Sequence, residues 1–215
     1  VIEISKDIII LSRKIASLDV FSTLGFIAKM HNWCRPLIDN SKDFIVKDGR
    51  HSVVEKTIFK KSLNAFVPND CSLSTNEHLW LITGPNMAGK STFLRQNAHI
   101  IILAQIGSYV PAKQAKIGIA SKLFSRIGAS DNISKGQSTF MVEMLETSNI
   151  IKNADDKSFI ILDEIGRGTS TFDGLAIAWA IIEKVLRSNK SRTLFATHYH
   201  ELTAVSYTHL RAPRD

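Results

Sequence analysis

The stretch Gly84-Pro85-Asn86-Met87-Ala88-Gly89-Lys90-Ser91 decides the fold of this chain. It fits the pattern G-x-x-x-x-G-K-[ST], in which a glycine-rich loop surrounds a phosphate with backbone N–H groups. The apolar residues 79–82 before it predict a buried strand. Residues 91–105 after it contain no proline or glycine and predict a helix, whose N-terminus adds a partial positive charge. The stretch therefore predicts a strand–loop–helix unit that binds a phosphate-bearing ligand.

Length and composition limit the class of protein. The chain has 215 residues, of which 44% are hydrophobic, enough for one medium domain or one domain plus a fragment. It begins with Val1, so we expect it to be cut from a longer chain. The net charge of +7 is compatible with polyphosphate or nucleic-acid partners, although Lys and Arg are scattered. No apolar run approaches the roughly 18–20 residues of a membrane span, and no signal peptide is evident.

The two cysteines, Cys34 and Cys71, lie far apart and form no C-x-x-C pattern. This favours reduced thiols in a cytosolic protein, with a disulfide or a metal site as the alternatives.

The first 30 residues carry an apolar stripe with alternating spacings of four and three. Its members are Ile4, Ile8, Leu11, Ile15 and Leu18, followed by Leu24 and Ile27. This period predicts an amphipathic helix of about 28 residues that ends before Cys34-Arg35-Pro36, longer than the usual 8–20. We interpret it as an arm or as the end of a neighbouring domain.

Shorter patterns follow along the chain. Residues 44–46, a turn at 47–49 and Val53-Val54 predict small antiparallel strands. Beyond the loop, strands are expected at 122–127, 158–162 and 193–196, and helices at 139–153 and 173–186. Because strands alternate with helices, the sequence predicts a mostly parallel sheet that is covered on both faces.

Asp163 and Glu164 close the apolar strand at 158–162, which is the Walker B arrangement. Two carboxylates at a buried strand end are costly unless they are paired or bound to metal. Lys90 is expected to reach the β- and γ-phosphates, while Ser91 and Asp163 hold Mg²⁺ and Glu164 orients or deprotonates the attacking water. The alternative is an ordinary turn.

Three further residues suit a nucleotide site, each with a structural alternative. His198 ends the third strand, on the sheet edge that faces the ligand crevice, and is a candidate for contact with the γ-phosphate. Ser138 opens a predicted helix and offers a hydroxyl to an anion, or acts only as a cap. Phe66 suits stacking on adenine or burial in the core equally well. His198, His200 and Glu201 also raise a metal alternative, without an evident further ligand.

Four strings in this order resemble the MutS family of DNA mismatch-repair ATPases. They are GPNMAGKST at 84–92, STFMVEM at 138–144, DEIGRGTST at 163–171 and ATHY at 196–199. DGRH at 48–51 and FVPND at 66–70 add weight, and YVPA at 109–112 looks closer to bacterial members. The resemblance covers about residues 1–205.

The resemblance implies a P-loop NTPase of ABC-ATPase type, with a mostly parallel sheet flanked by helices and a small antiparallel β part. Residues 1–32 would be the end of a helical core/lever domain, 33–205 the ATPase domain, and 206–215 a tail unlike the family. Ser52 stands where the family usually has Pro. By the same resemblance, we expect the domains that read mismatched DNA and the C-terminal dimerisation helix to lie outside this sequence.

The resemblance also implies roles for individual residues. ATP phosphates would be bound by Gly84, Pro85, Asn86, Met87, Ala88, Gly89, Lys90, Ser91 and Thr92. Mg²⁺ would be held by Ser91 and Asp163. Glu164 would be the catalytic carboxylate, with Lys90 and His198 as further catalytic residues. Phe66 would lie against adenine, Ser138 would contact the γ-phosphate of a second subunit, and residues 166–171 would line the dimer interface.

The implied function is that of the ATP-hydrolysing module of a mismatch sensor, which couples nucleotide state to mismatched-DNA binding and sliding-clamp formation. Its hydrolysis would depend on DNA in the full-length homodimer, with a MutL-type repair partner and no membrane. The expected location is the bacterial cytoplasm, associated with the nucleoid. Two alternatives stay open: an ABC-transporter ATPase, faintly suggested by residues 134–138, and a fragment that binds nucleotide without turnover.

Overall fold

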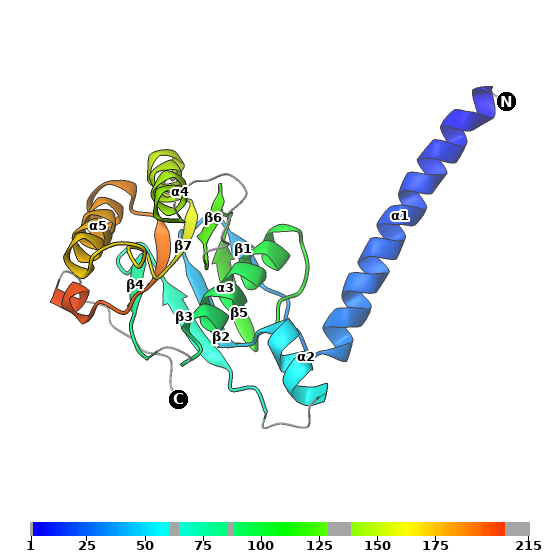
Figure 1. Ribbon diagram of the computed structural model, residues 1–215. Helices are drawn as coiled ribbons and strands as arrows, with labels where there is room; N and C mark the ends of the chain where they lie inside the picture. Colours follow the sequence, from blue (N-terminus) through cyan, green and yellow to red (C-terminus); the bar gives the residue numbers. More distant parts are fainter. Residues whose placement is uncertain (1, 61–64, 86–87, 129–138, 205–215) are drawn as a thin grey trace.

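The computed structural model describes residues 2–60, 65–85, 88–128 and 139–204. A mixed α/β body carries one long helix, α1 (Ile2–Met30), which extends away from it (Figure 1). This confirms the long helix predicted from the apolar stripe. In the described ranges, none of the helices combines the length and the apolar character needed to cross a membrane.

The central sheet is entirely parallel and has the strand order β4-β8-β7-β6. Its strands are β4 (Leu79–Ile82), β8 (Arg192–Ala196), β7 (Phe159–Asp163) and β6 (Leu123–Arg126). Ala196 is the register partner of both Ile82 and Asp163. The carboxyl ends of β4, β7 and β8 therefore meet at one edge, where the sequence placed the phosphate loop and the two carboxylates.

Helices cover both faces of this sheet, as predicted. On one face, α3 (Lys90–Gln105) packs through Leu94 and Ile101 against Ile161 and Leu194. On the other, α4 (Thr139–Asn153) and α5 (Thr171–Lys184) contribute to a second cluster. That cluster contains Leu81, Ile150, Ile160, Ala178 and Ile182. Neighbouring residues of β4 and β7 thus point to opposite faces, as the side-chain alternation of a strand requires.

A second, smaller sheet has the order β1-β5-β2-β3. Its strands are β1 (Leu37–Asp39), β5 (Gln114–Gly118), β2 (Phe44–Gly49) and β3 (Asn69–Leu73). β2 pairs antiparallel with β3 and β5, which confirms an antiparallel part in this region. The rings of Phe44 and Phe159 meet edge to face, with centroids 4.8 Å apart, so the two sheets share one core.

The prediction of a strand at Val53-Val54 is wrong, because these residues lie in α2 (Ser52–Lys60). The predicted turn at 47–49 is instead a bulge inside β2, with Asp48 at φ 49°. At the start of the helix, Nδ1 of His51 accepts a long hydrogen bond of 3.5 Å from the Val54 N–H, and Glu55 pairs with Arg50 at 2.8 Å. Local capping and an acidic first turn therefore override the strand preference of two β-branched residues.

The two sheets are also joined by a buried arginine. Arg192 at the start of β8 is 1% exposed. It donates to the carbonyl oxygens of Gly118 and Lys157 at 2.7 Å, Ile119 at 3.3 Å and Asp43 at 3.4 Å. Gly118 ends β5 and Ile119 follows it, Lys157 precedes β7 and Asp43 precedes β2, so one side chain links the end of β5 to the starts of β7 and β2.

Candidate nucleotide-binding and catalytic site

The glycine-rich loop joins β4 to α3 and uses glycine where the backbone requires it. Gly84 has φ 146° and Gly89 has φ 84°, a region that L side chains rarely adopt. Gly89 is also the N-cap of α3, and no side chain accepts a hydrogen bond there. The first-turn N–H groups of α3 are therefore available to an anion. Asn86 and Met87 lie outside the described residues.

Lys90 folds back over this loop. Its Nζ donates to the carbonyl oxygen of Gly84 at 2.6 Å and to that of Pro85 at 3.1 Å, and the residue is 5% exposed. A buried ammonium needs such acceptors, because burial without them is costly. The charge of Lys90 is thus held inside the loop, where phosphate oxygens would replace the carbonyl oxygens as acceptors.

Ser91 and Asp163, 72 positions apart, meet directly. The Ser91 hydroxyl donates to Oδ2 of Asp163 at 2.7 Å. The other carboxylate oxygen, Oδ1, is buried and has no hydrogen-bond partner among the described residues. Burial raises the pKa of Asp163, and the nearby charge of Glu164 raises it further, while the bond from Ser91 lowers it. A hydroxyl beside an unpartnered carboxylate oxygen fits Mg²⁺, which prefers oxygen ligands.

Glu164 follows in an unusual backbone conformation, with φ 52°. Its N–H donates to the carbonyl oxygen of Ala196 at 2.9 Å, which continues the pairing of β7 with β8 by one residue. Its side chain is 20% exposed and pairs with Nη1 of Arg167 at 2.6 Å. Glu164 was predicted from the sequence as a site residue and its partner Arg167 was not, although an acid and an arginine three residues apart were a visible signal.

A cavity of about 120 Å³ opens beside these carboxylates. It is lined by Arg126, Gly128, Glu143, Asp163, Glu164 and Arg167. The space is large enough for several water molecules, whose oxygens would lie between acidic and basic side chains. Arg126 and Glu143 could not be predicted for the site from the sequence, because nothing in the chain pattern shows that β6 and α4 bring them to the end of β7.

Of the remaining predicted site residues, the structure describes His198 and Phe66 but not Ser138. His198 is exposed and lies two residues beyond Ala196, and the centroids of the His198 and Tyr199 rings are 4.1 Å apart. The N–H of Thr197 donates to the carbonyl oxygen of Ile82, so His198 follows the same sheet edge as the loop. Phe66 is half-buried, ahead of β3 in the second sheet. Ser138 lies outside the described residues, and its role stays a prediction.

The metal alternative for His198, His200 and Glu201 gains no support. Within the part of the chain that the structure describes, no three His, Cys, Asp or Glu side chains gather closely enough to hold a metal ion. Cys34 and Cys71 are both free thiols, as predicted.

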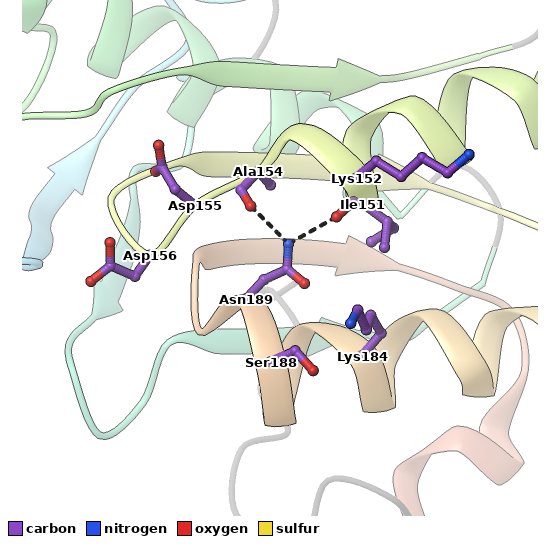
Figure 2. Close-up of a pocket in the computed structure, with 8 residues that line it drawn as sticks. All are labelled: Ile151, Lys152, Ala154, Asp155, Asp156, Lys184, Ser188 and Asn189. Atoms are coloured by element: carbon purple, nitrogen blue, oxygen red, sulfur yellow. Dashed lines mark hydrogen bonds between the residues drawn. The ribbon is translucent and has the colours of Figure 1, made fainter.

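A larger cavity of about 420 Å³ lies at the opposite end of β7 (Figure 2). Asn189 points into it and donates from Nδ2 to the carbonyl oxygens of Ile151 at 3.1 Å and Ala154 at 3.0 Å. These bonds satisfy the C-terminal end of α4, so Asn189 acts as a cap. Asp155 and Asp156 precede β7 whereas Asp163 ends it, which separates this cavity from the carboxylate site.

Comparison with known proteins identifies the family. A model of MutS domain V matches residues 80–212. The DNA mismatch repair protein MutS of Ruegeria pomeroyi is 56% identical over 201 residues, covering 93% of this chain and 23% of that protein. The protein of the same name from Rickettsia africae is 56% identical over 206 residues (96% and 23%), and that from Orientia tsutsugamushi 58% over 185 residues (86% and 21%). The chain therefore spans less than a quarter of the length of these relatives. The matched range contains the loop, α3 and the Ser91–Asp163 pair described above, and the chain belongs to the MutS family.

Proposed function

We propose that this chain is the ATP-binding and ATP-hydrolysing module of a DNA mismatch-recognition protein. The observation that carries the proposal is the 2.7 Å bond between Ser91 and Asp163, beside an unpartnered oxygen of Asp163. It joins a phosphate loop to a Walker B carboxylate in the arrangement that nucleoside triphosphatases use. Membership of the MutS family argues against the transporter alternative.

The residues divide the work as follows in this proposal. The loop from Gly84 to Thr92 surrounds the phosphates, and Lys90 exchanges its two carbonyl acceptors for phosphate oxygens. Ser91 and Asp163 hold Mg²⁺, whose charge offsets that of the phosphates when it is bound. The Glu164 carboxylate breaks its ion pair with Arg167 and then orients the attacking water or accepts a proton from it. His198 contacts the γ-phosphate, and Phe66 packs against adenine.

The ABC-type assembly belongs to the same proposal. Two chains form a homodimer, in which Ser138 of one subunit reaches the nucleotide of the other and residues 166–171 lie at the interface. In the longer protein, nucleotide state is coupled through α1 to mismatched-DNA binding and clamp formation, with a MutL-type partner, in the bacterial cytoplasm. The names of the similar proteins and the matched family support the link to mismatch repair.

Binding is tested with Lys90→Ala. Removal of the buried ammonium should abolish binding of ATP with Mg²⁺ in titration calorimetry, because no other loop side chain replaces its charge. Lys113→Ala is the matched control, since the Lys113 side chain is 75% exposed and should not affect binding. Equal affinities of wild type and Lys90→Ala would rule out the assignment of the loop.

Hydrolysis is tested with Glu164→Gln. The variant should bind ATP as tightly as wild type and lose about 10²–10⁴-fold in single-turnover hydrolysis, the usual contribution of a general base. A normal rate would exclude Glu164 from that role. A wild-type chain that binds ATP but never hydrolyses it would favour the alternative of a binding fragment without turnover.

A further inference from the structure

The peptide groups flanking Gly166 are held from two sides. The Gly166 N–H donates to Oε1 of Glu143 on α4 at 2.6 Å, and its carbonyl oxygen accepts from the Tyr199 hydroxyl at 3.1 Å. Both bonds are buried. Gly166 lies two residues after Glu164 and one before Arg167. The segment that carries the carboxylate is therefore fixed by α4 on one side and by the residues after β8 on the other.

Glycines let the neighbouring elements approach this segment closely. Gly166 has φ 90°, and a Cβ there would lie 2.6 Å from the carbonyl oxygen of Gly174 on α5. A Cβ on Gly168 would lie 3.2 Å from Cβ of Phe140 in the first turn of α4. The segment thus has little room to move independently of α4, and its conformation depends on the bond that Glu143 accepts.

Glu143 occupies a position where a carboxylate is costly. It is 8% exposed, and among the described residues the cationic group that pairs with it is Nη2 of Arg126, 3.9 Å from Oε2. Its charge also raises the pKa of Tyr199, in addition to the effect of burial. Packing alone would be served by an apolar side chain of similar size. The bond to the Gly166 N–H is the feature that requires an acceptor at this position.

We propose that Glu143 is a positioning residue for ATP hydrolysis, and the proposal rests on the proposed function of the site. By accepting from the Gly166 N–H, Glu143 fixes the backbone between Glu164 and Arg167. This sets the direction in which the Glu164 carboxylate faces the cavity that Asp163 and Glu143 also line. Glu143 itself does not need to contact ATP. A displacement of about 1 Å at such a carboxylate is enough to lower a rate on the order of 10²-fold.

Three variants separate this role from simple packing. Glu143→Met keeps the length of the side chain and removes the acceptor, whereas Glu143→Gln keeps an acceptor oxygen and removes the charge. Glu146→Met is the matched control on the same helix, because Glu146 pairs with Nε of Arg126 at 2.9 Å and is 53% exposed. It removes a carboxylate from Arg126 without changing the partner of Gly166.

Two measurements on the full 215-residue chain decide the proposal. Amide exchange of Gly166, followed by NMR, should accelerate at least about tenfold in Glu143→Met and stay near wild type in Glu143→Gln and Glu146→Met. The kcat for ATP hydrolysis should fall about 10–100-fold in Glu143→Met, with ATP affinity within about twofold of wild type and most of the rate recovered in Glu143→Gln.

Other results overturn the proposal. Unchanged exchange of Gly166 in Glu143→Met would show that Glu143 does not hold this peptide. Equal losses of kcat in Glu143→Met and Glu146→Met would assign the effect to Arg126. A parallel loss of ATP affinity and melting temperature in Glu143→Met would indicate damage to the fold. A wild-type chain without ATP hydrolysis would overturn the proposed function, while the exchange result would still decide whether Glu143 holds Gly166.

Discussion

The burial of the Asp163 carboxylate costs folding free energy, and its expected role as a Mg²⁺ ligand explains why a carboxylate stands there. Burial raises its pKa, so the protonated form is favoured in the folded state relative to the unfolded state. Stability from this group is therefore fully present below the ordinary carboxyl pKa and is lost as the pH rises through the higher folded-state pKa. Above that raised pKa the ionised Asp163 destabilises the nucleotide-free protein, and a bound cation would relieve that cost.

Asp163→Asn should therefore raise the melting temperature at pH 7.5 by about 2–4 °C, the change that roughly 1 kcal/mol produces in a domain of this size. The difference from wild type should shrink as the pH falls through the raised pKa of Asp163 towards the ordinary carboxyl range, because the protonated side chain carries no charge to bury. Added Mg²⁺ should stabilise wild type but not the variant. Thermal unfolding by circular dichroism measures all three effects.

Asp156→Asn is the control for that experiment. Asp156 is exposed, and the ion pair with Lys42 at 2.5 Å lowers its pKa, so its ionised form is favoured on folding. Its removal should not raise the melting temperature. A variant Asp163→Asn that melts at or below the wild-type temperature at pH 7.5 would contradict the account of a strained carboxylate.

Among the elements, those with a strong period or a buried apolar run were predicted well. The strand at 79–82 and the helix at 139–153 have the predicted bounds, and α1 follows its apolar stripe. Val53-Val54 was misassigned, because capping by His51 and a bulge at Asp48 depend on the surrounding structure. In the site, the Ser91–Asp163 pair followed from motif and strand order. Glu143 did not, because its partner Gly166 is reached only through the packing of α4.

Arg192 provides a test of how the elements are joined. Arg192→Met should lower the free energy of unfolding by about 2–4 kcal/mol, because four buried or part-buried carbonyl oxygens lose a charged donor. Urea denaturation measures the change. Arg187→Met is the control: its side chain is 78% exposed and pairs only with Glu183 among the charged groups described, so a change within about 0.5 kcal/mol is expected. Equal effects of the two variants would mean that Arg192 does not link the sheets.

At the scale of the whole molecule, the chain consists mainly of the proposed ATPase module. It spans less than a quarter of the length of its relatives. Its apolar helix α1 exposes large side chains, among them Leu18 at 69% and Phe21 at 72%. Figure 1 shows this helix standing clear of the sheets that form the site. Under the proposed function, the reading of mismatched DNA is therefore expected from the parts of the relatives that this chain does not match.

This organisation predicts that the chain binds matched and mismatched duplexes equally weakly. The net charge of +7 supports only salt-dependent contact with phosphates, with a Kd of about 10⁻⁴–10⁻⁶ M at physiological salt. Fluorescence anisotropy with two duplexes that differ in one base pair, at 50 and 200 mM salt as rough working points, measures both affinity and salt dependence. A tenfold or greater preference for the mismatch, on the order of 1.4 kcal/mol, would refute the prediction.

The two cysteines differ in burial, which allows selective labelling of one of them with a dye. Cys71 is fully buried, and burial raises the pKa of its thiol far above the usual range. Cys34 is half-buried, four residues after the end of α1, where its N–H and carbonyl oxygen both bond to Val110. Burial also raises the pKa of Cys34, so a maleimide dye should attach slowly, faster in mild alkali, and at this thiol alone while the fold is intact. The sequence as it stands thus offers single-site fluorescent labelling at the junction between α1 and the α/β body, without engineering a cysteine.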